Sequence, residues 1–162
     1  MILLKRILVA TDFSEASHVA LTYGRTLART FGASLHLLHV MENPFLRATP
    51  VDPHVFKAET MRHLGEQLTD DDRTMLGAVA ALEISDYPAE AIVTFAEARQ
   101  VDLVVMGTHS RGAMAQLLVG SVAEKVVRTA PCPVLTVRHP ERDFVVADAP
   151  VTTAHSTPGG LS

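Results

Sequence analysis

Cysteine is nearly absent from this chain of 162 residues, because Cys132 is its single cysteine. A disulfide within the chain is therefore excluded, and so is a metal site built from several thiolates. No apolar run approaches the roughly 20 residues that a membrane-spanning helix needs. At the N-terminus the charges follow the apolar residues, which is the reverse of a signal peptide. We therefore expect a cytoplasmic protein without a membrane partner.

An excess of basic charge is also absent. The formal net charge is -4, and no basic cluster stands out along the chain. A general nucleic-acid binder needs a basic face to neutralise phosphates, so nucleic acid is excluded as a partner. The length fits a single domain, which can bury roughly two thirds of the surface of the unfolded chain.

Short apolar runs alternate with longer amphipathic stretches, which predicts an α/β fold with a parallel sheet and helices on both faces. The strands are expected at 5–10, 34–40, 80–85, 101–106 and 134–138. A first helix should be capped by Ser14 and stop at Gly32, with Val19, Tyr23, Leu27 and Phe31 at helical spacing. Further helices are expected at 54–76, from Pro88 to about residue 100, and between Ser121 and Pro131.

Two segments lack a regular pattern. Residues 41–53 contain three prolines, which predicts an irregular, mobile flap. After His139 the apolar pattern ends, and the last residues are small and polar. We therefore expect one domain at residues 1–140 and a disordered tail at 141–162.

A glycine-containing loop follows the expected fourth strand. It reads Gly107-Thr108-His109-Ser110-Arg111-Gly112, and Gly120-Ser121 opens the next helix. A helix that begins here directs free N–H groups and the positive end of its dipole toward the loop, which favours a bound phosphate. The glycines would let the backbone approach that anion. Ser121 and Glu124 have the spacing of a capping box, so Ser121 is predicted to cap the helix.

Several motifs in this order resemble the universal stress protein family over residues 3–138. They are 7–14 and 37–40 at two strand ends, 102–109 at the loop, and 118–126 with 131–135 near the end. The resemblance implies a Rossmann-like, five-stranded parallel sheet in the order 3-2-1-4-5. It also implies a homodimer through the last strand, Val134 to Arg138, and ATP in the crevice where the strand order reverses.

The nucleotide-binding branch of that family carries Gly-x2-Gly-x9-Gly followed by serine or threonine. This pattern falls on Gly107, Ser110, Gly120 and Ser121, with Ser110 in place of the middle glycine. Serine costs roughly 1–2 kcal/mol if the position needs a positive φ, but otherwise it keeps the N–H and adds a hydroxyl. We interpret the loop as retaining ATP, with or without Mg²⁺. The residues expected around the nucleotide are Ala10, Thr11, Asp12, Val40, Met106, Gly107, His109, Ser110, Arg111, Gly112, Gly120, Ser121 and Val122.

Three of these residues also have a structural interpretation. Asp12 would accept hydrogen bonds from the nucleoside or cap the next helix, Val40 would contact adenine or belong to the core, and Arg111 would contact phosphate or solvent. No catalytic residue is assigned, because His109 has no identifiable partner and the loop lacks the lysine of a Walker A motif. No metal site is assigned either, since His36 and His39 should point to opposite faces of one strand.

The expected function is an ATP-binding, dimeric module of the stress response with a protein partner that the sequence does not identify. Two alternatives stay open. One is a dimeric stress protein that has lost nucleotide binding and acts by protein contacts. The other is a slow ATP hydrolase.

Overall fold

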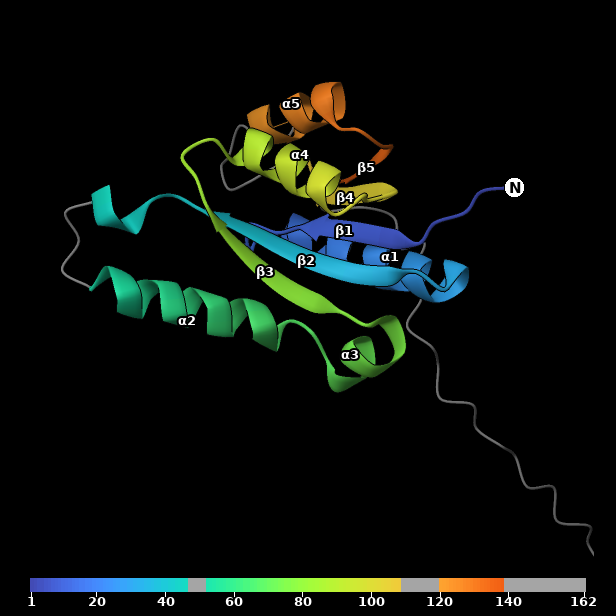
Figure 1. Ribbon diagram of the computed structural model, residues 1–162, viewed down its shortest axis with the longest axis horizontal. Coiled ribbons are helices and arrows are strands. Elements are labelled where there is room, and N and C mark those ends of the chain that lie inside the picture. The colour runs from blue at the N-terminus through green and yellow to red at the C-terminus, as the bar shows by residue number, and fades with distance from the viewer. Residues whose placement is uncertain (47–51, 109–119, 139–162) are drawn as a thin grey trace, which may run out of the picture.

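The architecture is a five-stranded parallel sheet in the order β3-β2-β1-β4-β5, which is the order that the family resemblance implied (Figure 1). The computed structural model describes residues 1–46, 52–108 and 120–138. The strands are β1 (Arg6–Ala10), β2 (Ser34–Met41), β3 (Val79–Ile84), β4 (Leu103–Gly107) and β5 (Val134–Val137). Predictions for His109, Ser110, Arg111, Gly112 and the tail 141–162 lie outside the described residues.

Helices cover both faces of the sheet. One face carries α1 (Glu15–Phe31), α2 (Pro53–Glu66) and α3 (Asp70–Leu76), and the other carries α4 (Pro88–Ala98) and α5 (Ser121–Thr129) (Figure 1). A short 3-10 helix, η1 (Pro44–Leu46), follows β2. None of the described helices is long and apolar enough to cross a membrane.

The sheet separates two apolar cores because alternate residues of each strand point to opposite faces. On β1, Ile7 and Val9 pack in the core beneath α1, and Leu8 packs in the core beneath α4 and α5. All three side chains have no exposed surface. A strand that is buried on both faces reads as a continuous apolar run, which explains why β1 and β4 could be located from the sequence.

Helix α1 has the predicted ends. Ser14 Oγ accepts a hydrogen bond from Ser17 N at 3.3 Å, and Gly32 ends the helix in the left-handed region with φ of 64°. The face that α1 turns to the sheet is made of small residues, including Ala16, Ala20, Gly24 and Ala28. The larger apolar side chains at helical spacing, Val19, Tyr23 and Leu27, are only partly buried and flank this contact. Phe31, the last of them, is 39% exposed.

The single helix expected at 54–76 is wrong, because the chain forms α2 and α3 with a break between Glu66 and Asp70. The cause is a capping box at Thr69. Its hydroxyl accepts from Asp72 N at 3.1 Å, and the Asp72 carboxylate accepts from Thr69 N at 2.9 Å. The reciprocal pair starts a new helix.

The irregular flap expected at 41–53 is also wrong in its described parts. Strand β2 continues to Met41, Pro44 begins η1, and Pro53 is the first residue of α2. Proline suits a first helical position because its φ is already helical and its missing N–H would have had no partner in the helix. Asp52 caps α2 by accepting from His54 N at 2.7 Å. Residues 47–51 lie outside the described residues.

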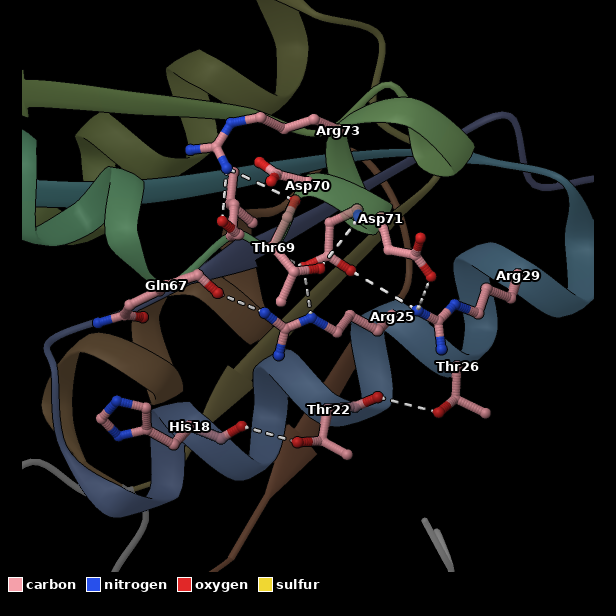
Figure 2. Close-up of polar contacts among 12 residues, drawn as sticks. His18, Thr22, Arg25, Thr26, Arg29, Gln67, Thr69, Asp70, Asp71 and Arg73 are labelled. Atoms are coloured by element: carbon pink, nitrogen blue, oxygen red, sulfur yellow. Dashed lines mark hydrogen bonds and ion pairs between the residues drawn. The ribbon is translucent and has the colours of Figure 1, made fainter. Parts of the chain in front are cut away.

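A buried carboxylate joins α3 to α1. Asp72 is fully buried, and its Oδ2 lies 2.8 Å from Nε of Arg25 on α1. Arg25 also donates to the carbonyl of Gln67 (Figure 2). Arg73 Nη2 donates to the carbonyl of Gly65 at 2.6 Å. Burial alone would raise the pKa of Asp72. The hydrogen bond from Thr69 N–H and the Arg25 guanidinium outweigh burial, so that this pKa lies below its ordinary value.

The close contact between α1 and β1 predicts opposite effects for one substitution at two helical glycines. A Cβ on Gly24 would lie 2.3 Å from Val9 Cγ2, and the branched valine cannot move away easily. Gly24→Ala should therefore destabilise the protein by about 1–3 kcal/mol. Gly65→Ala on α2 meets only the end of Arg73 at 3.8 Å and should stabilise by about 0.5–1 kcal/mol. Urea denaturation measures both, and equal effects would contradict the close contact.

The Asp72 network predicts a pH-dependent stability. Because the pKa of Asp72 is lower in the folded chain, its contribution is fully present above the pKa of the unfolded chain, about 4. That contribution is lost as the pH falls through the folded value. Asp72→Asn should cost about 3 kcal/mol at pH 7, and this difference from the original chain should shrink toward pH 3.

Urea denaturation of both chains at several pH values measures the difference. Asp71→Asn is the matched control, because the Asp71 side chain is 77% exposed and its neutralisation should change little. A cost of Asp72→Asn that stays constant with pH would show that the carboxylate charge is not what α3 depends on.

Candidate functional site

A cavity of about 310 Å³ lies at the carboxyl ends of β1, β2 and β4. Strand β1 pairs with β2 on one side and with β4 on the other, so the cavity sits where the strand order reverses. Crevices at this point of an open α/β sheet are where such folds bind ligands. The start of α5 closes the side of the cavity next to β4.

Nine of the thirteen residues expected around a nucleotide line this cavity. They are Ala10, Thr11, Asp12, Val40, Met106, Gly107, Gly120, Ser121 and Val122. The other four, His109, Ser110, Arg111 and Gly112, lie outside the described residues. Sequence reasoning missed Ser17, Leu38, Glu42, Ser85, Pro88, Ile92, Thr108 and Ala123 as lining residues. Glu42 and Ser85 closely follow a strand, which is the signal that could have found them.

Hydroxyl groups hold the wall of the cavity beside β1. Thr11 Oγ1 donates to Ser17 Oγ at 2.9 Å and accepts from Phe13 N at 3.1 Å. Ser17 Oγ donates in turn to the carbonyl of Ser14 at 2.8 Å. Both hydroxyl protons are therefore used within the wall, so these two side chains shape the cavity rather than offer it donors.

The turn after Thr11 is strained and held by aromatic contacts. Phe13 has a φ of 63°, a region that bulky residues rarely adopt. Its ring lies 4.4 Å from the ring of His39 and 4.7 Å from that of His63. Nδ1 of His39 is 2.7 Å from the carbonyl oxygen of Thr11. Since a carbonyl can only accept, Nδ1 carries the proton of this hydrogen bond.

The electrostatics of this turn keep His39 neutral at pH 7. Burial lowers the pKa of His39, and this effect exceeds the opposing influence of the Thr11 carbonyl and of Asp12. Asp12 itself is exposed and lines the cavity, and its Oδ1 accepts from Ser14 N at 3.0 Å. Ser14, not Asp12, caps α1, so the capping interpretation of Asp12 is wrong.

Gly107 has a structural reason that the sequence did not reveal. A Cβ at this position would lie 2.9 Å from Ala16 Cβ and 3.2 Å from Ser17 N. The absence of a side chain thus lets the first turn of α1 lie against the end of β4. Approach of a ligand to the backbone is not needed to explain this glycine.

The start of α5 also differs from the prediction. Gly120 is the N-cap, Ser121 is the first helical residue, and no side chain caps the helix. The cause is the hydrogen bond from Gly120 N to the carbonyl of Thr108, 2.6 Å long, which fixes where the chain enters the helix. Glu124 forms an ion pair with Arg128 at 2.9 Å instead of reaching back to Ser121.

The cavity is electrically polarised. The first turn of α5 borders it with Ser121, Val122 and Ala123. The first hydrogen bond within the helix runs from Glu124 N to Gly120 O, so the N–H groups of these three residues have no partner inside the helix. Asp12 and Glu42 place carboxylates on another part of the lining, and the described lining contains no lysine or arginine. This arrangement suits a ligand with an anionic group at one end and hydrogen-bond donors at the other.

Lys125 and His36 lie apart from this chemistry. Lys125 points outward from α5 and pairs with Glu90 of α4. The ring of His36 lies 6.2 Å from that of Phe95, on the sheet face opposite to His39. Within residues 1–46, 52–108 and 120–138, no three His, Cys, Asp or Glu side chains gather as a metal site would require.

A model of the universal stress protein family matches residues 4–138. The chain belongs to this family. A universal stress protein of Methanocaldococcus jannaschii is 32% identical over 146 residues, which are 87% of this chain and 86% of that protein. The structure resembles that of a universal stress protein from Lactobacillus plantarum, with a TM-score of 0.71 and 25% identity over 85% of this chain and 100% of the other.

A universal stress protein solved in complex with cAMP is also similar. Its TM-score is 0.60 and its identity 25%, over 83% of this chain and 97% of that chain. The family membership agrees with the expected fold, and the strand order of the structure is the one that the resemblance implied.

Proposed function

We propose that this universal stress protein binds an adenine nucleotide, with ATP as its ligand, and acts as a cytoplasmic homodimer that regulates a stress response. The observation that carries the proposal is the polarised cavity at the reversal of strand order. The N-terminus of α5 would receive the phosphates, and Asp12 would accept hydrogen bonds from the ribose. The similar universal stress protein in complex with cAMP supports an adenine nucleotide as the class of ligand.

The same cavity favours a bound and retained nucleotide over a rapidly hydrolysed one. Val40 and Met106 give it apolar walls, and the titratable side chains among its described lining residues are Asp12 and Glu42, which are acids. None of the described lining residues is a base placed against a nucleophile in the way that catalysis requires. A nucleotide held here would act by changing the surface that the dimer offers to a partner protein.

A larger side chain at Gly120, where α5 begins, should fill part of the cavity and abolish nucleotide binding. Gly120 has φ of -58° and ψ of 148°, which any residue adopts, so Gly120→Val should fold normally while its side chain occupies the cavity. We expect the affinity for Mg-ATP to fall by at least about tenfold in calorimetry. Gly65→Val on α2 is the control and should bind as the original chain does.

An unchanged affinity in Gly120→Val would contradict the proposed site. A second measurement separates the remaining outcomes. Freshly purified protein is denatured and filtered, and the released small molecules are identified by mass spectrometry. ATP near one per chain supports the proposal, whereas an empty protein that also fails to bind added Mg-ATP would favour a dimeric stress protein that acts by protein contacts alone.

The proposed dimer forms through β5, which is an edge strand with only β4 as its partner among the described strands. The carbonyl of Pro133 accepts from Val104 N of β4, and the carbonyl of Val137 accepts from Thr108 N. Because alternate residues of a strand direct their backbone groups to opposite sides, Thr136 directs its N–H to the free edge. Thr136→Pro should remove this donor and produce a monomer in sedimentation analysis. Thr136→Val keeps the N–H and should stay dimeric, and a dimer in both variants would exclude this edge.

A further inference from the structure

A second, open groove lies on the α4 face of the sheet, beside β3. Its volume is about 670 Å³, and it is bordered by Glu83 of β3 and by the side of α4 that carries Glu90, Phe95 and Arg99. The groove exists because α4 packs over β2, which leaves this face of β3 without a helix above it. It is separate from the cavity described above, although Ser85 borders both.

The free edge of β3 runs along this groove. Within the described residues β3 pairs with β2 alone, and Figure 1 shows it as the outermost strand on its side of the sheet. Ser85 N donates to the carbonyl of Met41, so every second residue counted back from Ser85 directs its N–H and carbonyl groups toward β2. Ala80, Leu82 and Ile84 therefore direct their N–H and carbonyl groups outward. A strand edge without a partner can accept an additional strand.

Side chains of such a strand would alternate between the two faces of the sheet, and those on the α4 face would enter the groove. The middle of the groove is apolar and shallow, with Ala91 and Ala98 beside Phe95. Tyr87, at the end nearest the nucleotide cavity, is 68% exposed although it is a large side chain. A medium-sized apolar side chain fits between these groups.

The two ends of the groove carry opposite charges. Glu83 and Glu90 lie toward the carboxyl end of β3, and Arg99 lies at the far end, with its guanidinium 5.3 Å from the centre of the Phe95 ring. Glu90 pairs with Lys125, but Glu83 and Arg99 have no ion-pair partner among the described residues. Glu90, which lies with Glu83 at one end of the groove, is nine positions before Arg99 along α4, a rise of about 14 Å, which is the length of about four residues of extended chain.

We propose that the β3 edge and its groove bind an extended peptide segment of a partner protein. The segment carries a basic and an acidic residue four positions apart with an apolar residue midway between them. The basic residue pairs with Glu83, the apolar one packs between Ala91 and Phe95, and the acidic one pairs with Arg99. This surface does not depend on a bound nucleotide, so its test is independent of the proposed function.

Two fluorescein-labelled peptides test the groove on the full chain without nucleotide. One has the core Lys-Thr-Val-Thr-Glu and the other the reverse order, because a strand can join β3 in either direction. Fluorescence polarisation should show binding of at least one. Glu83→Lys should weaken that binding by about tenfold, since it turns an attraction into a repulsion, and a peptide with glutamate in place of its lysine should recover it.

The controls separate edge pairing from a general charge effect. Glu59→Lys changes an exposed carboxylate of α2 by the same charge and should leave binding unchanged. N-methylation of the peptide backbone at the residues that face β3 should abolish binding, because it removes the donors that pair with the edge. Absence of binding by both peptides, or binding that Glu83→Lys and N-methylation do not affect, would overturn the proposal. So would a self-associated chain that Glu83→Lys separates in sedimentation analysis, because a second copy would then occupy the edge.

Discussion

The close approach of α1 to the centre of the sheet sets the shape of the site. At Gly107 and at Gly24 the chain lacks a Cβ where one would overlap with Ala16 or Val9, so the helix can lie directly on β4 and β1. Its first turn then reaches Thr11, and the hydrogen bonds through Ser17 become possible. A helix displaced by even one methyl group would separate these hydroxyls and open that wall of the cavity.

The opposite wall depends on a second short connection. Gly120 N donates to Thr108 O, and Thr108 N donates to Val137 O, so the end of β4, the start of α5 and the end of β5 are tied together. Thr108 and Gly120, which both line the cavity, are therefore held side by side. Because the N-terminus of α5 and the carboxylates of Asp12 and Glu42 come from different connections, the polarity of the cavity is a property of the sheet's topology rather than of one motif.

The strands could be predicted because buried strands read as apolar runs, and the place of the cavity because ligands gather where strand order reverses. The strand order itself, and several of the nine lining residues, followed only from the resemblance to the family. Two errors share a cause. The break at Thr69 and the start of α5 at Gly120 depend on contacts between residues that a periodic pattern does not contain. The pairing of Asp72 with Arg25, which are 47 positions apart, likewise leaves no local signal in the sequence.

The two free edges of the sheet have different characters, and this difference suggests how a dimer could use both. Strand β5 is short, half-buried and without charge, which suits pairing with an identical copy, whereas β3 borders a groove with charged ends. If β5 joins two copies, their β3 edges lie at the far ends of one continuous sheet. A partner that carries two matching segments could then bind both edges at once, and the gain in avidity would make recognition depend on dimerisation.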